Sequence, residues 1–349
     1  MNIDDILSDA IDMKASDVHI TAGVTPIFRV NGELLNYGTT ILNPLDTEKL
    51  VKKVTNENQF DKLIEFGEYD FSYAIPGKSR FRVNAYIQRG SFGMALRIIP
   101  YEIPSMESLG LPAIIPELSD LPRGLILVTG PTGSGKSTTL ATMINKINSE
   151  RKCHILTLED PIEYLHKHNK SIVNQREVGA DTLSFSNGLR AALREDPDVI
   201  LVGEMRDLET ISIAITAAET GHLVLSTLHT IGAPQTIDRI IDVFPPHQQQ
   251  QIRVQLASVI QAIITQQLLP RADGKGRIAA FEVMVATPAI RNLIREDKIH
   301  QIETAMQTGA KYKMQTMDSA LLNLYKNGSI TKDTAISRAV SSEEIKKYI

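Results

Sequence analysis

The sequence predicts an α/β fold: a mostly parallel sheet with helices on its faces, preceded by a smaller α+β domain and followed by further helices. The chain has 349 residues, of which 42% are hydrophobic. This exceeds the size at which one core usually stops growing, so two domains are expected. From residue 123 onward, apolar strand-like runs alternate with helix-compatible segments, as in parallel sheets. Before residue 100, short strand-like runs are separated only by turns, which is typical of an antiparallel sheet.

The N-terminal domain is expected to span residues 1–100. The stretch IFRVNGELL predicts a strand, a turn at Asn31-Gly32 and a second strand. Three further strands are predicted between Tyr69 and Ile99, with interruptions at Pro76-Gly77 and Gly90-Ser91. These runs together predict an antiparallel sheet with flanking helices.

Residues 101–122 are expected to link the two domains. Four prolines interrupt every periodicity in this stretch: Pro104, Pro112, Pro116 and Pro122. Because proline lacks a backbone N–H and disfavours helix interiors, the segment is typical of a linker or of a clamp between domains.

The C-terminal domain is expected over residues 123–349, with a helical region at residues 287–349. Thr287 and Pro288 fit the N-cap and the first residue of a helix. An apolar stripe at helical spacing follows them: Ile290, Leu293 and Ile294.

Composition excludes several classes of protein. No apolar run approaches the roughly 20 residues that cross a bilayer, and the N-terminus is acidic, so we expect a cytoplasmic protein. The net charge of −4 provides no global attraction to nucleic acid. The single cysteine, Cys153, excludes an internal disulfide and a CxxC zinc site, and it is predicted to be buried in a strand.

The strongest chemical motif is GPTGSGKST, which lies between the apolar strand LILVT and a helix-compatible segment. It matches the phosphate-binding loop, or P-loop, in the required strand-loop-helix setting. Lys136 is expected to reach the β- and γ-phosphates of ATP, and Ser137 to bind Mg²⁺. The alternative is a flexible glycine loop. The predicted nucleotide-binding residues are Gly130, Pro131, Thr132, Gly133, Ser134, Gly135, Lys136, Ser137 and Thr138.

Ionisable side chains follow other predicted parallel strands, and ligands of such sheets bind beyond the carboxyl ends of the strands. Glu159, Asp160 and Glu163 follow one strand, whereas Glu204 and His229 follow two others. We expect Glu159 and Asp160 to bind Mg²⁺ directly or through water. Either Glu163 or Glu204 can orient the attacking water as general base, and His229 can sense the γ-phosphate.

Each of these assignments has a structural alternative. The segment EDPIE can form the N-terminus of a helix, where acidic residues and proline are favoured. Glu204 can form a surface salt bridge with Arg206, and His229 can be a packed histidine. His222 lies seven residues before His229 along the same strand, about 23 Å away, so the two cannot share a metal, and we expect His222 to be structural.

Several motifs together resemble the secretion-ATPase superfamily of type II secretion and type IV pilus motors, across essentially the whole chain. They are GPTGSGKSTT, LEDPIEY, QREVG, FSNGLRAALREDPDVILVGEMRD and GHLVLSTLHT. Within this superfamily, ASDVHI at 15–20 and AIRNLIRE at 289–296 resemble motifs of the pilus retraction branch. LLPRADGKGRIAAFEVM has no cysteine where assembly members carry a tetracysteine zinc site, so no zinc is expected. By spacing alone, AIRNLIRE predicts a helix that packs through Ile290, Leu293 and Ile294, and only the resemblance implies that it couples to retraction.

The resemblance implies a RecA-like ATPase domain, an N-terminal PAS-like domain and assembly into a homohexameric ring. It also implies that ATP binds near the interface of the two domains, where arginines of the N-terminal domain reach it. The segments RFRVN and ALRII match those family segments and indicate Arg82 and Arg97 as catalytic candidates. Arg80 shares a strand face with Arg82 by alternation and is a third candidate. The alternative is a set of arginines on a solvated strand face.

The function implied is a hexameric motor that powers type IV pilus retraction and twitching motility by Mg²⁺-dependent ATP hydrolysis. Its expected partners are an inner-membrane platform protein and, indirectly, the pilin fibre. The motor would then lie at the inner face of the cytoplasmic membrane. The alternatives are a related pilus-assembly or secretion ATPase, a RecA-like DNA motor, and a module that binds nucleotide without turnover. No nucleic acid partner is expected.

Overall fold

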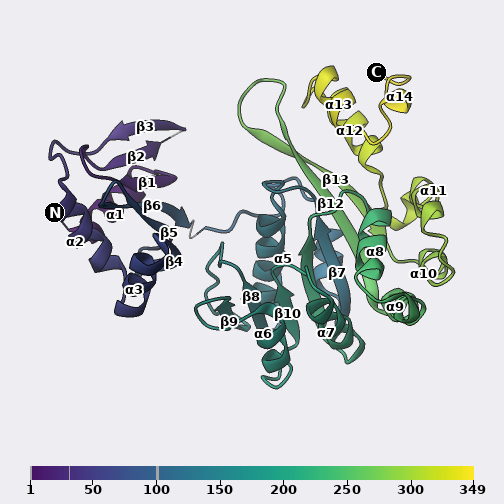
Figure 1. Ribbon diagram of the computed structural model, residues 1–349. Coiled ribbons are helices and arrows are strands. Elements are labelled where there is room, and N and C mark those ends of the chain that lie inside the picture. Colours follow the sequence, from purple (N-terminus) through teal and green to yellow (C-terminus); the bar gives the residue numbers. More distant parts are fainter. Residues whose placement is uncertain (1, 31, 100–101) are drawn as a thin grey trace. The chain divides into compact units, whose positions relative to one another are not determined.

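The computed structural model describes residues 2–30, 32–99 and 102–349 (Figure 1). The chain divides into two compact units. The first comprises Met1–Glu102 with Glu163–Leu165, and the second comprises Ile103–Ile162 with His166–Ile349. Asn31, the first residue of the predicted Asn-Gly turn, lies outside the described residues, as do residues 100 and 101 at the predicted domain boundary.

The described part of the first unit contains a six-stranded antiparallel sheet in the order β3-β2-β1-β6-β5-β4. Its strands are β1 (Asp17–Ile20), β2 (Ile27–Val30), β3 (Glu33–Asn36), β4 (Glu68–Ile75), β5 (Ser79–Gln88) and β6 (Ser91–Ile99). Its helices are α1 (Ile3–Asp12), α2 (Pro44–Val54) and α3 (Glu57–Phe66). The predicted strands and the antiparallel sheet are therefore confirmed.

Local sequence explains where the helices of this unit begin and end. Asn43 and Asn56 cap α2 and α3 and form capping boxes with Asp46 and Gln59. Helix α3 ends at Gly67, whose φ of 82° is the left-handed conformation that glycine adopts without steric cost. One sheet face packs into the core through alternating residues such as Phe81, Val83 and Ala85 on β5. The intervening residues Arg80, Arg82 and Asn84 consequently lie on the other face.

The described part of the second unit contains a seven-stranded sheet in the order β13-β12-β7-β11-β10-β8-β9. All neighbouring strands are parallel except β13, which runs antiparallel to β12. The strands are β7 (Gly124–Thr129), β8 (His154–Glu159), β9 (Ile172–Glu177), β10 (Val199–Val202), β11 (Leu223–Leu228), β12 (Ile260–Pro270) and β13 (Arg277–Val285). The predicted α/β class with a mostly parallel sheet is confirmed.

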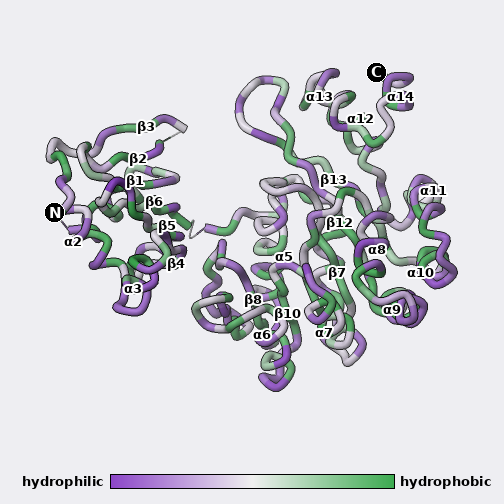
Figure 2. Tube along the Cα trace, in the orientation of Figure 1, coloured by the Kyte–Doolittle hydropathy of each residue, from purple (hydrophilic) through white to green (hydrophobic). Residues whose placement is uncertain are grey.

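Helices cover both faces of this sheet, and the central strands are buried on both sides. Every residue of β7 and β11 is buried, and Figure 2 shows hydrophobic stretches along the central strands. One hydrophobic cluster packs α7 to α10 on one face, and another packs α4 and α5 on the opposite face. The first helices are α4 (Ile115–Ser119), α5 (Lys136–Glu150), α6 (Phe185–Ala192), α7 (Leu208–Glu219), α8 (Ala233–Asp242) and α9 (Pro246–Val259).

The C-terminal region is helical, as predicted, and Thr287 caps α10 by accepting the N–H of Ile290. A small separate core that includes Met317, Leu321 and Ile345 packs the last three of these helices against the ends of β12 and β13. The elements are α10 (Pro288–Arg295), η1 (Ile299–Gln301), α11 (Ile302–Gln307), η2 (Ala310–Tyr312), α12 (Met317–Lys326), α13 (Lys332–Arg338) and α14 (Ser342–Ile345).

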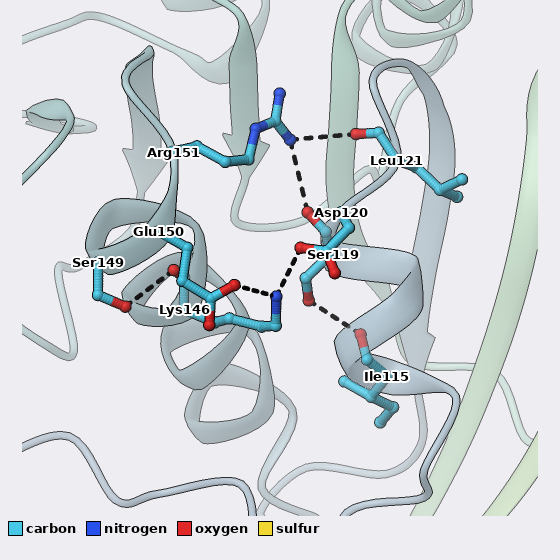
Figure 3. Close-up of polar contacts among 8 residues, drawn as sticks. All are labelled: Ile115, Ser119, Asp120, Leu121, Lys146, Ser149, Glu150 and Arg151. Carbon is cyan, nitrogen blue, oxygen red and sulfur yellow. Dashed lines mark hydrogen bonds and ion pairs between the residues drawn. The ribbon is translucent and has the colours of Figure 1, made fainter.

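The proline-rich segment differs from the linker that its prolines predict, because residues 103–122 belong to the second unit. Ile115 and Leu118 of α4 are buried against α5. Lys146 pairs with Asp120 at 2.5 Å, and Arg151 donates to the carbonyl of Leu121 at 3.1 Å (Figure 3). Proline breaks helix periodicity without preventing the apolar residues between prolines from packing, which explains the difference.

Cys153 also differs from its prediction. It lies one residue before β8, is half-buried, and its Sγ lies 3.2 Å from the hydroxyl of Ser171. The strand HILTLE begins only at His154, whose ring Nδ1 lies 2.9 Å from the carbonyl of Glu195.

Candidate functional site

The predicted P-loop connects the buried strand β7 to helix α5. Gly130, Gly133 and Gly135 have φ values of 136°, 76° and 92°, which favour glycine. At Gly130, a Cβ atom would lie 2.2 Å from the carbonyl oxygen of Gln266, so the backbone approach itself requires glycine. The loop leads directly into the N-terminus of α5, where the helix dipole favours an anion.

Lys136 and Ser134 have the surroundings expected of phosphate-binding residues. The ammonium of Lys136 is buried and donates to the carbonyls of Gly130 and Pro131 at 2.9 and 3.0 Å. It is therefore folded back over the loop that would surround the phosphates. Ser134 Oγ is buried and has no hydrogen-bond partner within the described residues. A buried hydroxyl without a partner is costly, so this position fits an external polar group such as a phosphate.

Gln266 on β12 holds the loop, although nothing in the motif indicates it. Its side-chain amide donates to the carbonyl of Ser134 at 2.5 Å and accepts from Thr139 Oγ1 at 2.9 Å. The nearest signal in the sequence is the polar Gln266-Gln267 pair inside a largely apolar strand. That signal cannot identify the P-loop as the partner.

A cavity of about 320 Å³ lies beside the P-loop within the second unit. Gly135, Thr138 and Thr139 form its wall at the P-loop, and two arginines line it further along the chain, Arg271 and Arg277. Its apolar lining residues are Leu109, Leu111, Leu268, Ile278, Ala279 and Phe281. Its size and mixed lining suit a base and a sugar joined to phosphates held by the loop. Sequence reasoning did not find this cavity.

Glu204 and His229 follow neighbouring strands and come together. Glu204 lies just beyond β10 and His229 just beyond β11, and their side chains approach to 3.4 Å. The other oxygen of Glu204 pairs with Nε of Arg206 at 2.7 Å. The alternative salt bridge thus exists, but it leaves one oxygen of Glu204 toward His229. The Glu204 side chain is 16% exposed and that of His229 45%, so the pair is accessible from solvent.

The segment EDPIE does not begin a helix, so that alternative is wrong: residues 160–171 are irregular. Glu159 ends β8, where its carboxylate accepts from Thr157 Oγ1 at 2.6 Å and from the Gln175 amide at 3.1 Å. Asp160 is exposed. The end of β8 adjoins that of β10, since the Gly203 N–H donates to the carbonyl of Leu158 at 2.7 Å.

Glu163 is grouped with the first unit, together with Tyr164 and Leu165. Ser137 is half-buried in the first turn of α5. Within the described residues, no group of three or more His, Cys, Asp or Glu side chains could hold a metal by itself. A Mg²⁺ ion near Ser137 would therefore need the oxygens of a bound nucleotide and water to complete its coordination.

Arg82 and Arg97 lie opposite each other on β5 and β6 of the first unit. Arg82 is exposed, and Arg97 Nε pairs with Asp17 of β1 at 3.0 Å while its side chain remains 69% exposed. Burial raises the pKa of Asp17, but hydrogen bonds from Ser16 and Arg97 and the charge of Arg97 lower it overall. Both arginines thus lie on the open sheet face that strand alternation predicts. Asp17, within the motif ASDVHI, was not singled out from the sequence.

His222 and the motif AIRNLIRE both have clear structural contacts. His222 Nδ1 lies 2.8 Å from the carbonyl of Ala217 at the end of α7, which is consistent with the predicted structural role. In AIRNLIRE, Ile290 and Ile294 are buried. Arg291 does not point freely to solvent: it donates to the carbonyls of Ala257 and Ser258 at 2.5 and 2.8 Å. It therefore satisfies carbonyls at the end of α9.

No helix in the described part of the chain is long and apolar enough to span a membrane. Residues 1–333 match the family model T2SSE, type II/IV secretion system protein. The chain is 50% identical over 339 residues to the type IV pilus retractation ATPase PilT of Pseudomonas aeruginosa, covering 97% of this chain and 98% of that protein. It is 48% identical over 339 residues to a twitching motility protein of Neisseria gonorrhoeae, covering 95% of this chain and 91% of that protein.

A solved structure is also similar. The crystal structure of the pilus retraction motor PilT with bound ADP matches with a TM-score of 0.93 and 52% identity, over 99% of each chain.

Proposed function

The chain belongs to the family of type II/IV secretion system proteins and is an ATPase, and from this premise we propose that it is the homohexameric motor of type IV pilus retraction. The family resemblance drawn from the sequence motifs is confirmed. The observation that supports the proposal most directly is the P-loop, with Glu204 and His229 paired beyond the ends of strands of the same sheet. Such an arrangement can bind a triphosphate and direct water onto it.

In the proposed mechanism, the P-loop N–H groups and Lys136 bind the phosphates, and the cavity of about 320 Å³ receives the base and sugar. Ser137, Glu159 and Asp160 would hold Mg²⁺, directly or through water. When bound, Mg²⁺ neutralises the charge that develops on the phosphate oxygens. The relative with bound ADP supports nucleotide as the ligand.

Glu204 is the proposed water-orienting carboxylate. One of its oxygens faces His229, and the segment behind it is held by the Thr227 hydroxyl, which donates to the carbonyl of Gly203 at 2.6 Å. A side chain held in this way is oriented before the reaction, which is a requirement for a general base. Glu163 remains the second candidate for this role.

Arg82 and Arg97 are the proposed residues of the N-terminal unit that reach the nucleotide, with Arg80 as a weaker third. Since the phosphoryl-transfer transition state spreads negative charge, an arginine from another domain would couple hydrolysis to domain motion. The motor would pass this motion to an inner-membrane platform protein and withdraw pilin from the fibre. It would be a cytoplasmic protein held at the membrane by that partner.

The ATPase test is Mg²⁺-dependent hydrolysis measured against protein concentration. If neighbouring subunits complete each other's sites, the specific activity rises with concentration to a plateau, and Glu204→Ala abolishes it. Glu150→Ala is the matched control, because it removes an exposed, ion-paired glutamate at the far end of α5. A flat specific activity would count against the ring and against the arginine assignments.

The cellular test separates retraction from assembly and secretion. A strain that lacks this chain should extend pili that do not retract, and the wild-type chain but not Glu204→Ala should restore retraction. Loss of the pili themselves would favour an assembly motor instead.

A further inference from the structure

Glu282 on β13 is a buried carboxylate that the proposed hydrolysis site does not use. Only 6% of the residue is exposed. Burial raises the pKa of Glu282, as does the charge of Glu303, while hydrogen bonds from the N–H groups of Ala233 and Met317 act in the opposite direction. Burying a carboxyl group is costly unless hydrogen bonds compensate for it. The hydrogen-bond partners of Glu282 therefore indicate its structural role.

Those partners include the first residues of two helices. Glu282 Oε1 accepts the N–H of Ala233, the first residue of α8, at 2.8 Å. Glu282 Oε2 accepts the N–H of Met317, the first residue of α12, at the longer distance of 3.4 Å. The N-cap residue of α8 is Gly232, which has no side chain to accept a hydrogen bond. Glu282 of β13 thus accepts a hydrogen bond at the N-terminus of α8, where the N-cap residue has no side chain to do so.

The same carboxylate belongs to a buried row across three strands that ends at the P-loop. In register, Glu282 pairs with Thr265 on β12, and Thr265 pairs with Thr129 on β7. Thr265 Oγ1 lies 3.4 Å from Glu282 Oε1 and 3.0 Å from Thr129 Oγ1. Thr129 immediately precedes Gly130 of the P-loop.

The loop between β11 and α8 consists of residues 229–232, and it begins with His229. Its first end is held by β11 in the centre of the sheet, and its second end by the bond from Ala233 to Glu282. Because both ends are held, a loop this short has few accessible conformations. In the conformation observed, His229 lies 3.4 Å from Glu204.

We propose that Glu282 is a positioning residue that holds the His229 loop against Glu204 through the N-terminus of α8. This inference rests on the proposed role of His229 in hydrolysis. Its contact with Met317 places α12 on the same carboxylate, so α12 and the His229 loop share one anchor.

The kinetic test is Glu282→Gln in the full chain, which keeps the shape but removes the charge. We expect kcat to fall about tenfold, because charge-assisted hydrogen bonds are among the stronger ones, with KM for ATP within about twofold. Glu303→Gln is the matched control: Glu303 is an exposed glutamate on the same small cavity as Glu282, and its loss should leave kcat within about twofold.

A double variant separates positioning from general destabilisation. If Glu282 acts through His229, adding Glu282→Gln to the His229→Ala variant should lower kcat by less than about twofold. The imidazole that Glu282 positions is then already absent. Multiplicative effects of the two substitutions would overturn the proposal.

Hydrogen exchange reports on the anchor whatever the role of His229. In Glu282→Gln, the backbone amides of residues 229–233, 235 and 236 should exchange about tenfold faster, while those of residues 136–143 in α5 stay unchanged. Unchanged exchange at residues 229–236 would overturn the proposal. A His229→Ala variant with the wild-type rate would instead contradict the proposed role of His229, and exchange would then decide by itself whether Glu282 anchors the loop.

Discussion

The two units display their functional candidates in different ways, and the difference follows from their sheets. In the antiparallel sheet of the first unit, Arg82 and Arg97 lie on an open face, in register with each other. In the second unit, β7 and β11 are buried on both faces, so polar side chains concentrate beyond the strand ends, as Glu204 and His229 do. An open face leaves charged residues solvated and weakly fixed, whereas the ends of a parallel sheet hold side chains in a defined arrangement.

The largest effect that would sharpen this comparison is expected at Lys136. Replacing it by alanine should lower kcat for ATP about 10²–10³-fold, because a positioned charge at the phosphates is lost from a preorganised site. Lys146→Ala is the control, since it removes a lysine of the same helix that pairs with Asp120 and Glu150 instead. Steady-state kinetics of the two variants checks the prediction, and equal losses would contradict it.

A smaller effect compares hydrophobic residues of the two sheets. Leu225→Ala in the fully buried strand β11 should lower the free energy of unfolding by about 2–5 kcal/mol, through lost burial and the cavity left behind. Leu34→Ala on β3, where the leucine is 54% exposed, should change it by less than about 0.5 kcal/mol. Urea denaturation measures both values. A similar loss for the two variants would mean that β3 is covered in solution.

The smallest effect concerns Asp17, whose folded-state pKa is lowered from the ordinary value of 3.8. Its contribution to stability is therefore present above the unfolded-state pKa and is lost as the pH falls through the lowered folded-state value. Because Arg97 is largely exposed, the contribution should be below about 1 kcal/mol. Asp17→Asn should remove this part of the pH dependence below pH 4 in thermal unfolding. Identical profiles for wild type and variant would show that the pair contributes nothing.

Several features could be predicted because they depend on neighbouring residues. The P-loop is contiguous, so its glycines, Lys136 and the flanking strand and helix follow from one short stretch. The N-cap at Thr287 depends on a residue three positions away, Ile290. The alternation of strands and helices predicts a parallel sheet, and from it Glu204 and His229 are expected at the same edge, beyond the carboxyl ends of their strands.

The sequence by itself thus determined the α/β class and the secretion-ATPase family, and it predicted the residues of the phosphate-binding loop. Only the tertiary structure decided which distant side chains hold that loop and its neighbours. Gln266 binds Ser134 across 132 positions, and Glu282 binds Ala233 across 49. Such contacts depend on strand order and register, which local propensity does not encode. The packing of the proline-rich stretch on α5 likewise depends on tertiary structure. Burial of its apolar residues depends on which other elements lie against the segment.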